Sequence, residues 1–331
     1  MTTHFKEVIA NAGGAQVRFK HPAGLRHGQG PESGLQVVAT HSVYHAVLSA
    51  VRQESDRNKL ELATSAAAAG PGLHAVMIRV SQRGQPVMQI QVREVPRFLW
   101  AAIVIDDMGR DLEATRKLLA LNYPITFSVL PYLQYTQETA EEAHRRGREV
   151  MLHLPMQPEA AGHASPGKGA VLVGMSGAEV QRVVQNDLDA VPYAAGVNNH
   201  MGSRATQNMA LMVDVMKILS DRRLYFIDSR TTAASVALEA ARREGMPSFY
   251  RAVFLDDKET VPYTLGQLRE FRRKVEQDGV ALAIGHPHAT TIAALAKFLP
   301  ELKKADIELV APSQIVRLPE VAHLNPPAST N

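Results

Sequence analysis

The fold of this 331-residue chain is indicated by one short stretch, Leu99-Trp100-Ala101-Ala102-Ile103-Val104-Ile105, which Asp106-Asp107 follow directly. Seven consecutive uncharged residues, β-branched in their second half, are typical of a buried parallel strand. Two carboxylates at the end of such a strand are costly unless their charge is compensated. Because neighbouring strand residues point to opposite faces, the two aspartates are expected to point in different directions and take different roles. The alternative is that they cap the helix that follows Met108-Gly109.

Strand-like and helix-like segments alternate regularly after residue 98. This alternation predicts parallel strands joined by right-handed helical crossovers. About 220 residues suit a closed or nearly closed (β/α) barrel, and a doubly wound open sheet is the competing α/β fold. The candidate strands are 99–106, 125–131, 149–156, 195–202, 224–230, 248–255, 281–287 and 307–311. The candidate helices include Leu112–Leu121, Glu138–Arg146, Met209–Asp221 and a helix through Leu188 that begins at a capping box of Ser176 and Glu179.

Residues 1–96 have a different pattern, which predicts a separate small α+β module. A helix is expected over Ser42–Asn58, because apolar residues form one stripe there. Alternating apolar residues on both sides of residues 82–85 predict a hairpin with one solvated face. Loops are expected at 13–14, 21–34 and 66–72. The predicted organisation is therefore a module at 1–96, a barrel at 97–318 and a disordered tail at 319–331.

Composition narrows the classes of function. Cysteine is absent, so any metal must be held by His, Asp or Glu side chains. The formal net charge is only +3 and no long basic run occurs, which argues against nucleic acid as a partner. No segment approaches the ~20 apolar residues of a membrane span. The first residues lack the pattern of a signal peptide, and no feature specifies an oligomeric state.

Ionisable side chains recur where the predicted strands end. Since the carboxyl ends of barrel strands meet at one mouth, these side chains are expected to lie together. Taken singly, His153 could be a structural core histidine, His200 a turn cap and Asp228–Arg230 an ion pair. The pair Asp256-Asp257 is expected to cap a loop. The residues at the strand ends are Asp106, Asp107, His153, Asn199, His200, Asp228, Arg230, Asp256, Asp257 and His286.

One carboxylate and two imidazoles with open coordination positions form a known pattern for a catalytic divalent metal, Zn²⁺ above all. The predicted ligands are Asp107, His153 and His200. Zinc acidifies its bound water, a neighbouring carboxylate can take the proton, and a histidine across the pocket can protonate the leaving group. Asp106 and His286 stand at the strand ends where those two roles would be filled.

Five ordered motifs resemble the divergent polysaccharide deacetylase family, a distant branch of the NodB-type carbohydrate esterases. The resemblance covers about residues 98 to 316 and leaves out the first 95. The motifs are Ile105-Asp106-Asp107-Met108-Gly109, Leu152-His153-Leu154-Pro155-Met156, Asn198-Asn199-His200-Met201-Gly202-Ser203, Phe226-Ile227-Asp228-Ser229-Arg230-Thr231 and Gly285-His286-Pro287.

The resemblance implies a NodB-like, distorted (β/α)7 barrel and metal-dependent removal of N- or O-acetyl groups from a polysaccharide. It implies that Asp106 is the base, that Asp107 and His153 bind the metal, and that His286 is the general acid. The family pattern has a second histidine four residues after His153, where this chain has Gln157, and His200 is taken as its substitute.

Asn199, Asp228 and Arg230 are predicted to bind the substrate. By resemblance, the substrate is a cell-envelope glycan and the protein is periplasmic. Two other functions stay open. One is a non-catalytic glycan-binding or scaffold protein on the same barrel, suggested by Gln157. The other is a different metal hydrolase that acts on amides or phosphoesters.

Overall fold

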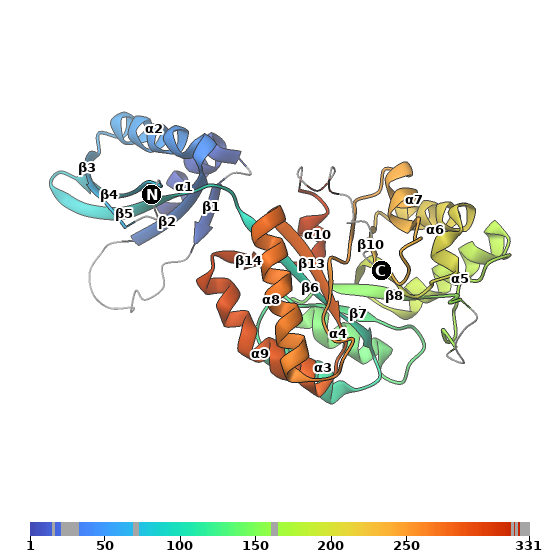
Figure 1. The fold of residues 1–331 in the computed structure, drawn as a ribbon. Coiled ribbons are helices and arrows are strands. Elements are labelled where there is room, and N and C mark those ends of the chain that lie inside the picture. Colours follow the sequence, from blue (N-terminus) through green and yellow to red (C-terminus); the bar gives the residue numbers. More distant parts are fainter. Residues whose placement is uncertain are drawn as a thin grey trace. The chain divides into compact units, whose positions relative to one another are not determined.

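A computed structural model describes residues 1–14, 17–20, 33–68, 73–159, 165–318, 321 and 324. The chain divides into two compact units, Met1–Phe98 and Leu99–Asn331 (Figure 1). The predicted tail at 319–331 lies almost entirely outside the described residues, as do most of the predicted loops at 21–34 and 66–72. No helix in the described part of the chain is long and apolar enough to span a membrane.

The second unit is built around β6, the strand that contains Leu99–Ile105 and the two aspartates that follow. Its nine-stranded sheet has the order β11-β10-β9-β8-β7-β6-β13-β12, and β14 pairs with β6 beside this path. Every pairing in the sheet is parallel. The strands are β6 (Leu99–Met108), β7 (Thr126–Val129), β8 (Val150–Met156), β9 (Ala194–Met201), β10 (Tyr225–Asp228), β11 (Ser248–Tyr250), β12 (Val253–Phe254), β13 (Val280–Gly285) and β14 (Ile307–Leu309).

The two edge strands of this sheet are consecutive in the chain, and this curls the sheet toward closure. Only Arg251 and Ala252 separate β11 from β12. The Arg251 amide donates to Asp228 O on one side, and the Ala252 amide donates to Leu282 O on the other. Counted as one broken strand, β11 and β12 complete a ring with β10, β9, β8, β7, β6 and β13. The predicted α/β class and distorted (β/α)7 barrel are confirmed, and the doubly wound alternative is not observed.

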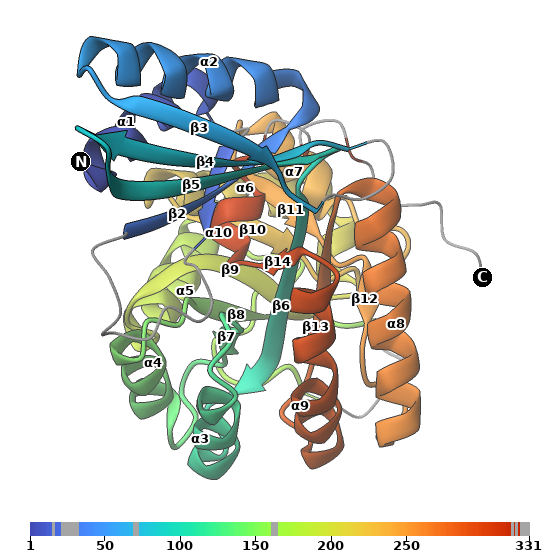
Figure 2. The same ribbon diagram turned by 90° about the vertical axis from the view of Figure 1, so that its left-hand side faces the viewer.

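Helices connect successive strands and surround the sheet (Figures 1 and 2). The capping box predicted for Ser176 and Glu179 is present, with Glu179 N donating to Ser176 Oγ and Ser176 N donating to Glu179 Oε2. The helices and one 3₁₀ turn are α3 (Leu112–Ala120), α4 (Thr136–Arg145), α5 (Gly177–Ala190), η2 (Ala205–Gln207), α6 (Met209–Asp221), α7 (Ala237–Arg243), α8 (Val261–Asp278), α9 (Ala289–Lys304) and α10 (Pro312–Ile315).

Close packing between β9 and β10 makes Gly196 intolerant of a side chain. A Cβ at Gly196 would lie 2.3 Å from the Tyr225 ring, which is held in place by a 2.7 Å hydrogen bond from its hydroxyl to Glu149. Gly196→Ala is therefore expected to lower the free energy of unfolding by about 2 kcal/mol, measured by urea denaturation. The control is Gly266→Ala in α8, where a Cβ meets nothing within 4 Å and helix propensity favours alanine. Equal stability of the two variants would contradict this packing.

The first unit is a five-stranded sheet of order β1-β2-β5-β4-β3, with β2 and β5 parallel and the other pairs antiparallel. The predicted helix and hairpin are confirmed as α2 and as β4 with β5. Helix α1 and strands β1, β2 and β3 were not expected; α1 has no side-chain cap that would mark its start. The elements are α1 (Thr2–Gly13), β1 (Val17–Lys20), β2 (Ser33–Thr40), α2 (His41–Arg57), β3 (Glu61–Ala66), β4 (Ala75–Gln82) and β5 (Gln85–Val95).

Candidate metal centre

The backbone at Asp107 brings both aspartates to the same point at the end of β6. Asp107 has φ 55°, and the pairing register with β7 shifts between Ile105 and Met108. As a result, Asp106 Oδ2 lies 3.5 Å and Asp107 Oδ1 lies 3.3 Å from the same atom, His153 Nε2. The expectation from strand alternation that the two side chains point apart is therefore wrong. Left-handed backbone at a non-glycine residue costs energy and is found preferentially at functional sites.

The aspartate pair does not cap the following helix. That position belongs to Asp111, whose carboxylate accepts a hydrogen bond from Glu113 N at the start of α3.

Asp107, His153 and His200 form a compact cluster contributed by β6 and by the adjacent strands β8 and β9, with β7 between β6 and β8. Asp107 Oδ1 lies 2.9 Å from His200 Nδ1, and His200 Nδ1 lies 3.1 Å from His153 Nε2. Each of the three residues offers a ligand atom, and these atoms all lie within 4.8 Å of one another. Asp107 Oδ1 is buried and makes no hydrogen bond apart from its contacts with the two imidazoles. A buried carboxylate oxygen facing two imidazole nitrogens is suited to hold a divalent cation.

Asn198, which was not among the predicted site residues, holds His153 and Asp106 in place through hydrogen bonds. His153 Nδ1 donates to Asn198 Oδ1 at 2.9 Å, which leaves His153 Nε2 directed at the cluster. The Asn198 amide donates to Asp106 Oδ1 at 2.8 Å and to Ser229 Oγ at 3.1 Å. Such a partner fixes the tautomer and ring orientation of a metal-binding histidine. Asn198 and His200 are two residues apart in β9, so they face the same side, and this spacing is the signal that could have revealed Asn198.

The electrostatics of the cluster favour charged groups despite burial. Burial alone would raise the pKa of Asp107, but His153 and His200 hold it well below its usual range. Burial alone would lower the pKa of His153, but the carboxylates of Asp106 and Asp107 raise it. The surroundings therefore keep Asp107 ionised and ready to bind a cation.

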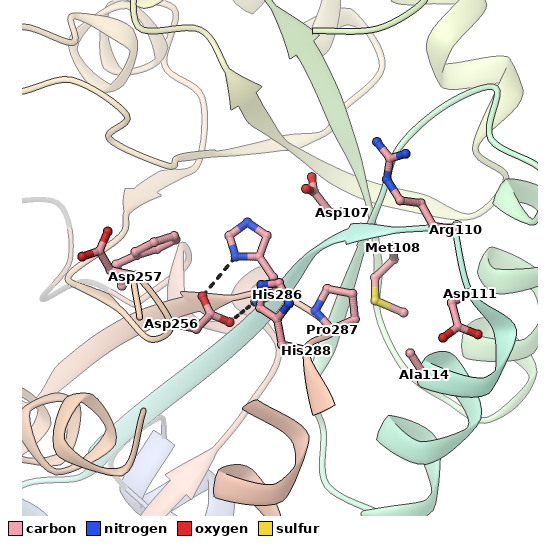
Figure 3. A pocket seen from close by; sticks show the side chains of 12 residues that line it. Asp107, Met108, Arg110, Asp111, Ala114, Asp256, Asp257, His286, Pro287 and His288 are labelled. Atoms are coloured by element: carbon pink, nitrogen blue, oxygen red, sulfur yellow. Dashed lines mark hydrogen bonds and ion pairs between the residues drawn. The ribbon is translucent and has the colours of Figure 1, made fainter. Parts of the chain in front are cut away.

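A cavity of about 500 Å³ opens beside Asp107 and is lined by His286, the residue that directly follows β13 (Figure 3). His286 N and His286 Nδ1 donate to the two carboxylate oxygens of Asp256, at 2.6 and 3.0 Å. Thr291 Oγ1 also donates to Asp256, at 2.7 Å. Asp107 lines the same cavity, so one member of the cluster and His286 face a common space.

Asp256 is the functional candidate that the sequence analysis misread as a loop cap. Its side chain is fully buried, and its carboxylate orients His286 rather than capping a loop. Burial would lower the pKa of His286, but Asp256, with Asp106 and Asp107, raises it to about 9. His286 is therefore protonated at neutral pH, and its Nδ1–H is committed to Asp256. The signal for this pairing was the position of Asp256, at the end of the strand beside the one that carries His286.

Of the three predicted substrate-binding residues, Asn199 and Asp228 make hydrogen bonds that stabilise the local backbone. Asn199 donates to Met201 O and accepts from Ser229 N, both at 2.9 Å. The buried carboxylate of Asp228 accepts from Arg230 N and Ser235 Oγ, both at 2.8 Å. Arg230 has left-handed backbone with φ 50°. Substrate binding by these residues stays a prediction.

Gln157, which stands where the family resemblance calls for a histidine, supports a loop. Its side-chain oxygen accepts from Val173 N at 2.8 Å, and its backbone carbonyl accepts from Arg204 N and Ala205 N. Gln157 is not part of the Asp107–His153–His200 cluster. The third side chain comes instead from His200 on the next strand.

The second unit is thus a parallel barrel that carries an aspartate–histidine cluster at the carboxyl ends of its strands. The chain belongs to the divergent polysaccharide deacetylase family, whose sequence model matches residues 103–316.

Two relatives align with about two thirds of this chain. The uncharacterized protein YibQ of Escherichia coli (strain K12) is 37% identical over 226 residues, which are 68% of this chain and 70% of YibQ. An uncharacterized protein of Haemophilus influenzae is 37% identical over 216 residues, 65% of this chain and 76% of its own. The crystal structure of an uncharacterized protein from Agrobacterium tumefaciens C58 has the same fold, with a TM-score of 0.63 and 24% identity over 66% of this chain and 89% of that one.

Proposed function

We propose that this chain is a metal-dependent hydrolase that removes acetyl groups from a cell-envelope polysaccharide. One observation carries the proposal: Asp107 of the Asp107–His153–His200 cluster and His286 line the same cavity, and Asp106 lies beside the cluster. This arrangement supplies ligands, a base and an acid within one site.

The residues of the cluster fit a divalent cation, and their donor types favour Zn²⁺. One carboxylate oxygen and two imidazole nitrogens are the donor types that zinc takes in catalytic sites. Asp107 Oδ1 faces both imidazoles, and the hydrogen bond from His153 Nδ1 to Asn198 leaves His153 Nε2 directed at the cluster, which agrees with this assignment. The cation's chemistry there would be to acidify water and to polarise the carbonyl oxygen of the acetyl group.

The chain's own residues then move two protons. Asp106 accepts the proton of the attacking water as the new bond forms between the water oxygen and the acetyl carbon. His286 donates its Nε2 proton to the nitrogen or oxygen of the sugar as the bond to the acetyl carbon breaks. Acetate and the free amine or alcohol are the products. Asp256 stabilises the charged imidazole of His286 until the proton is transferred.

The direct test combines metal analysis with acetate release. The purified full-length protein is expected to hold about one zinc ion per chain and to release acetate from acetylated chito-oligosaccharides or peptidoglycan fragments. His200→Ala should lose most of the bound metal, whereas His144→Ala, which removes a ring stacked on Tyr193 outside the cluster, should keep it. Full activity of a metal-free His200→Ala protein would refute the proposal. Phosphatase or amidase activity without acetate release would assign a different hydrolase reaction.

A non-catalytic glycan-binding role is the second candidate, because Gln157 supports a loop instead of providing a ligand. Saccharide binding that is unaffected by Asp106→Asn, together with no acetate release from a broad substrate panel, would favour it. We also propose a periplasmic location, which cell fractionation of the native source would test.

A further inference from the structure

The cavity beside Asp107 is lined by a second cluster of side chains of the metal-binding types. Asp256, His286 and His288 each offer a ligand atom, and these atoms all lie within 4.8 Å of one another. All three residues line the cavity (Figure 3). We call them the second triad. The proposed proton transfer gives roles to Asp256 and His286 but none to His288, so the reaction does not account for the whole cluster.

Strand register and the start of α9 bring the second triad together. Strands β12 and β13 are parallel, and Phe254 lies opposite Ile284. Asp256 and His286 each come two residues later, so they lie side by side where the two strands end. His288 follows as the N-cap of α9, and its side chain makes no capping hydrogen bond. The helix therefore uses the backbone of this residue and places no demand on its imidazole.

The spacing between Asp256 and His286 suits two ligands of one cation. Asp256 Oδ1 lies 3.0 Å from His286 Nδ1, its one hydrogen-bond partner among the described residues. The other oxygen, Oδ2, accepts from His286 N and Thr291 Oγ1, which fixes the plane of the carboxylate. Zinc bonds of about 2.0–2.1 Å place two ligands of a tetrahedral ion about 3.3 Å apart. A cation could therefore replace the hydrogen between Oδ1 and Nδ1 after a small outward movement of the ring.

The surroundings of His288 also favour a cation. Its ring is half-buried, and the ring centroids of His286 and His288 lie 5.8 Å apart. The Glu259 carboxylate lies 3.5 Å from His288 Nδ1, and the exposed Asp257 lines the same cavity. Carboxylates beside a site raise the local concentration of cations. The two imidazoles therefore lie in a region of negative charge that a divalent cation can reach from the cavity.

We propose that the second triad is a second zinc site, and that Zn²⁺ bound there inhibits hydrolysis. One carboxylate and two imidazoles are donor types that zinc takes in proteins. Zinc at His286 Nδ1 displaces the hydrogen of that nitrogen into solvent. The ring then carries only its Nε2 proton, and loss of this proton would leave an imidazolate instead of a neutral imidazole. His286 is therefore a much weaker acid, and protonation of the leaving group is suppressed.

The second site is expected to bind zinc more weakly than the first cluster. At the first cluster, Asp107 Oδ1 already faces two imidazole nitrogens. At the second triad, the hydrogen between Asp256 and His286 must first be displaced. The first site should therefore fill during purification, and the second only when zinc is added in excess. The binding of the second ion does not depend on activity, whereas its inhibitory effect rests on the proposed function.

The first test is calorimetric titration of the full-length protein, with its first site filled, with Zn²⁺. His288→Gln is expected to weaken binding of the second ion by about 100-fold or more, because losing a ligand should cost at least as much as losing a partner of a ligand. His288→Asn, which suits the N-cap of α9, should show the same loss. The matched control is His144→Gln at an exposed histidine outside the cavity, which should bind both ions as the unmodified protein does. His200→Ala should lose the first ion and keep the second.

The second test compares the rate of acetate release in excess zinc with the rate at one equivalent. In the unmodified protein and in His144→Gln this ratio should fall about tenfold or more, as expected when a general acid is lost. In His288→Gln it should stay near one, and a ratio is insensitive to any change in the basal rate. The proposal fails if the second ion binds equally to both glutamine variants, or if it binds without lowering the rate. If no acetate is released under any condition, the deacetylase proposal fails, and the zinc titration still confirms or refutes the second site.

Discussion

Asp106→Asn is expected to lower the rate of acetate release by about 10³-fold while leaving the metal bound. Asparagine has nearly the same shape as aspartate, and its oxygen can still accept the hydrogen bond from the Asn198 amide. What it lacks is the basic oxygen that faces the cluster 3.5 Å from His153 Nε2. A proton acceptor is then missing at the attacking water. Metal content by mass spectrometry and initial rates of acetate release, measured on the same preparation, would show whether the two properties separate.

The matched control is Asp107→Asn, the same change at the neighbouring residue. Asp107 Oδ1 belongs to the cluster, so this variant is expected to lose both metal and activity. If Asp106→Asn also loses the metal, Asp106 is a ligand and the two roles are assigned wrongly. If Asp106→Asn keeps most of its activity, another group is the base.

The barrel was predictable because parallel strands buried on both faces leave a strong signal. The stretch 99–105 and the later apolar segments are each bounded by turns and separated by amphipathic helices, so each strand of the second unit falls within a few residues of its predicted position. The first unit was harder, because β1 and β2 flank a segment rich in Gly and Pro, and β3 is almost fully exposed. An exposed strand has no apolar alternation by which to recognise it.

The sequence predicted which residues form the site but not how their side chains are arranged in it. That Asp107, His153 and His200 meet follows from strand order, since β6, β8 and β9 end at the same mouth. That Asp106 approaches the same imidazole follows from the left-handed backbone at Asp107, which no residue type signals. Asn198 and Asp256 were missed for another reason. Each acts through a histidine at a neighbouring strand, and although sequence position marks each residue as a candidate, the histidine that it contacts is identified only when strand order and register are known.

Asp256→Asn is expected to move the alkaline limb of the pH–rate profile to lower pH. The general acid must be protonated, and the unmodified protein has a pKa of about 9 at His286, so activity should persist until pH rises toward that value. Without the Asp256 carboxylate, the pKa of His286 should fall to about 6.5 or lower, because burial then acts with less opposition. At pH 8 the protonated fraction, and with it kcat/KM, should drop about 30-fold, and at pH 6 much of the loss should be recovered.

A cation bound at Asp107 would weaken the part of this pKa shift that comes from Asp106 and Asp107. The effect of Asp256 on the pKa of His286 is therefore obtained from the difference between the pH–rate profiles of the unmodified protein and of Asp256→Asn. His286→Ala is the companion variant: it removes the acid itself, so its activity should be low at every pH and should show no recovery at pH 6. The pKa of His286 can be followed without any substrate from its imidazole signals in an NMR titration.

By linkage, the raised pKa of His286 also stabilises the fold. This stabilisation is fully present below about pH 6.5 and is lost as the pH rises through about 9. An unchanged alkaline limb in Asp256→Asn would mean that Asp256 does not control the acid, and that the group titrating there is another one.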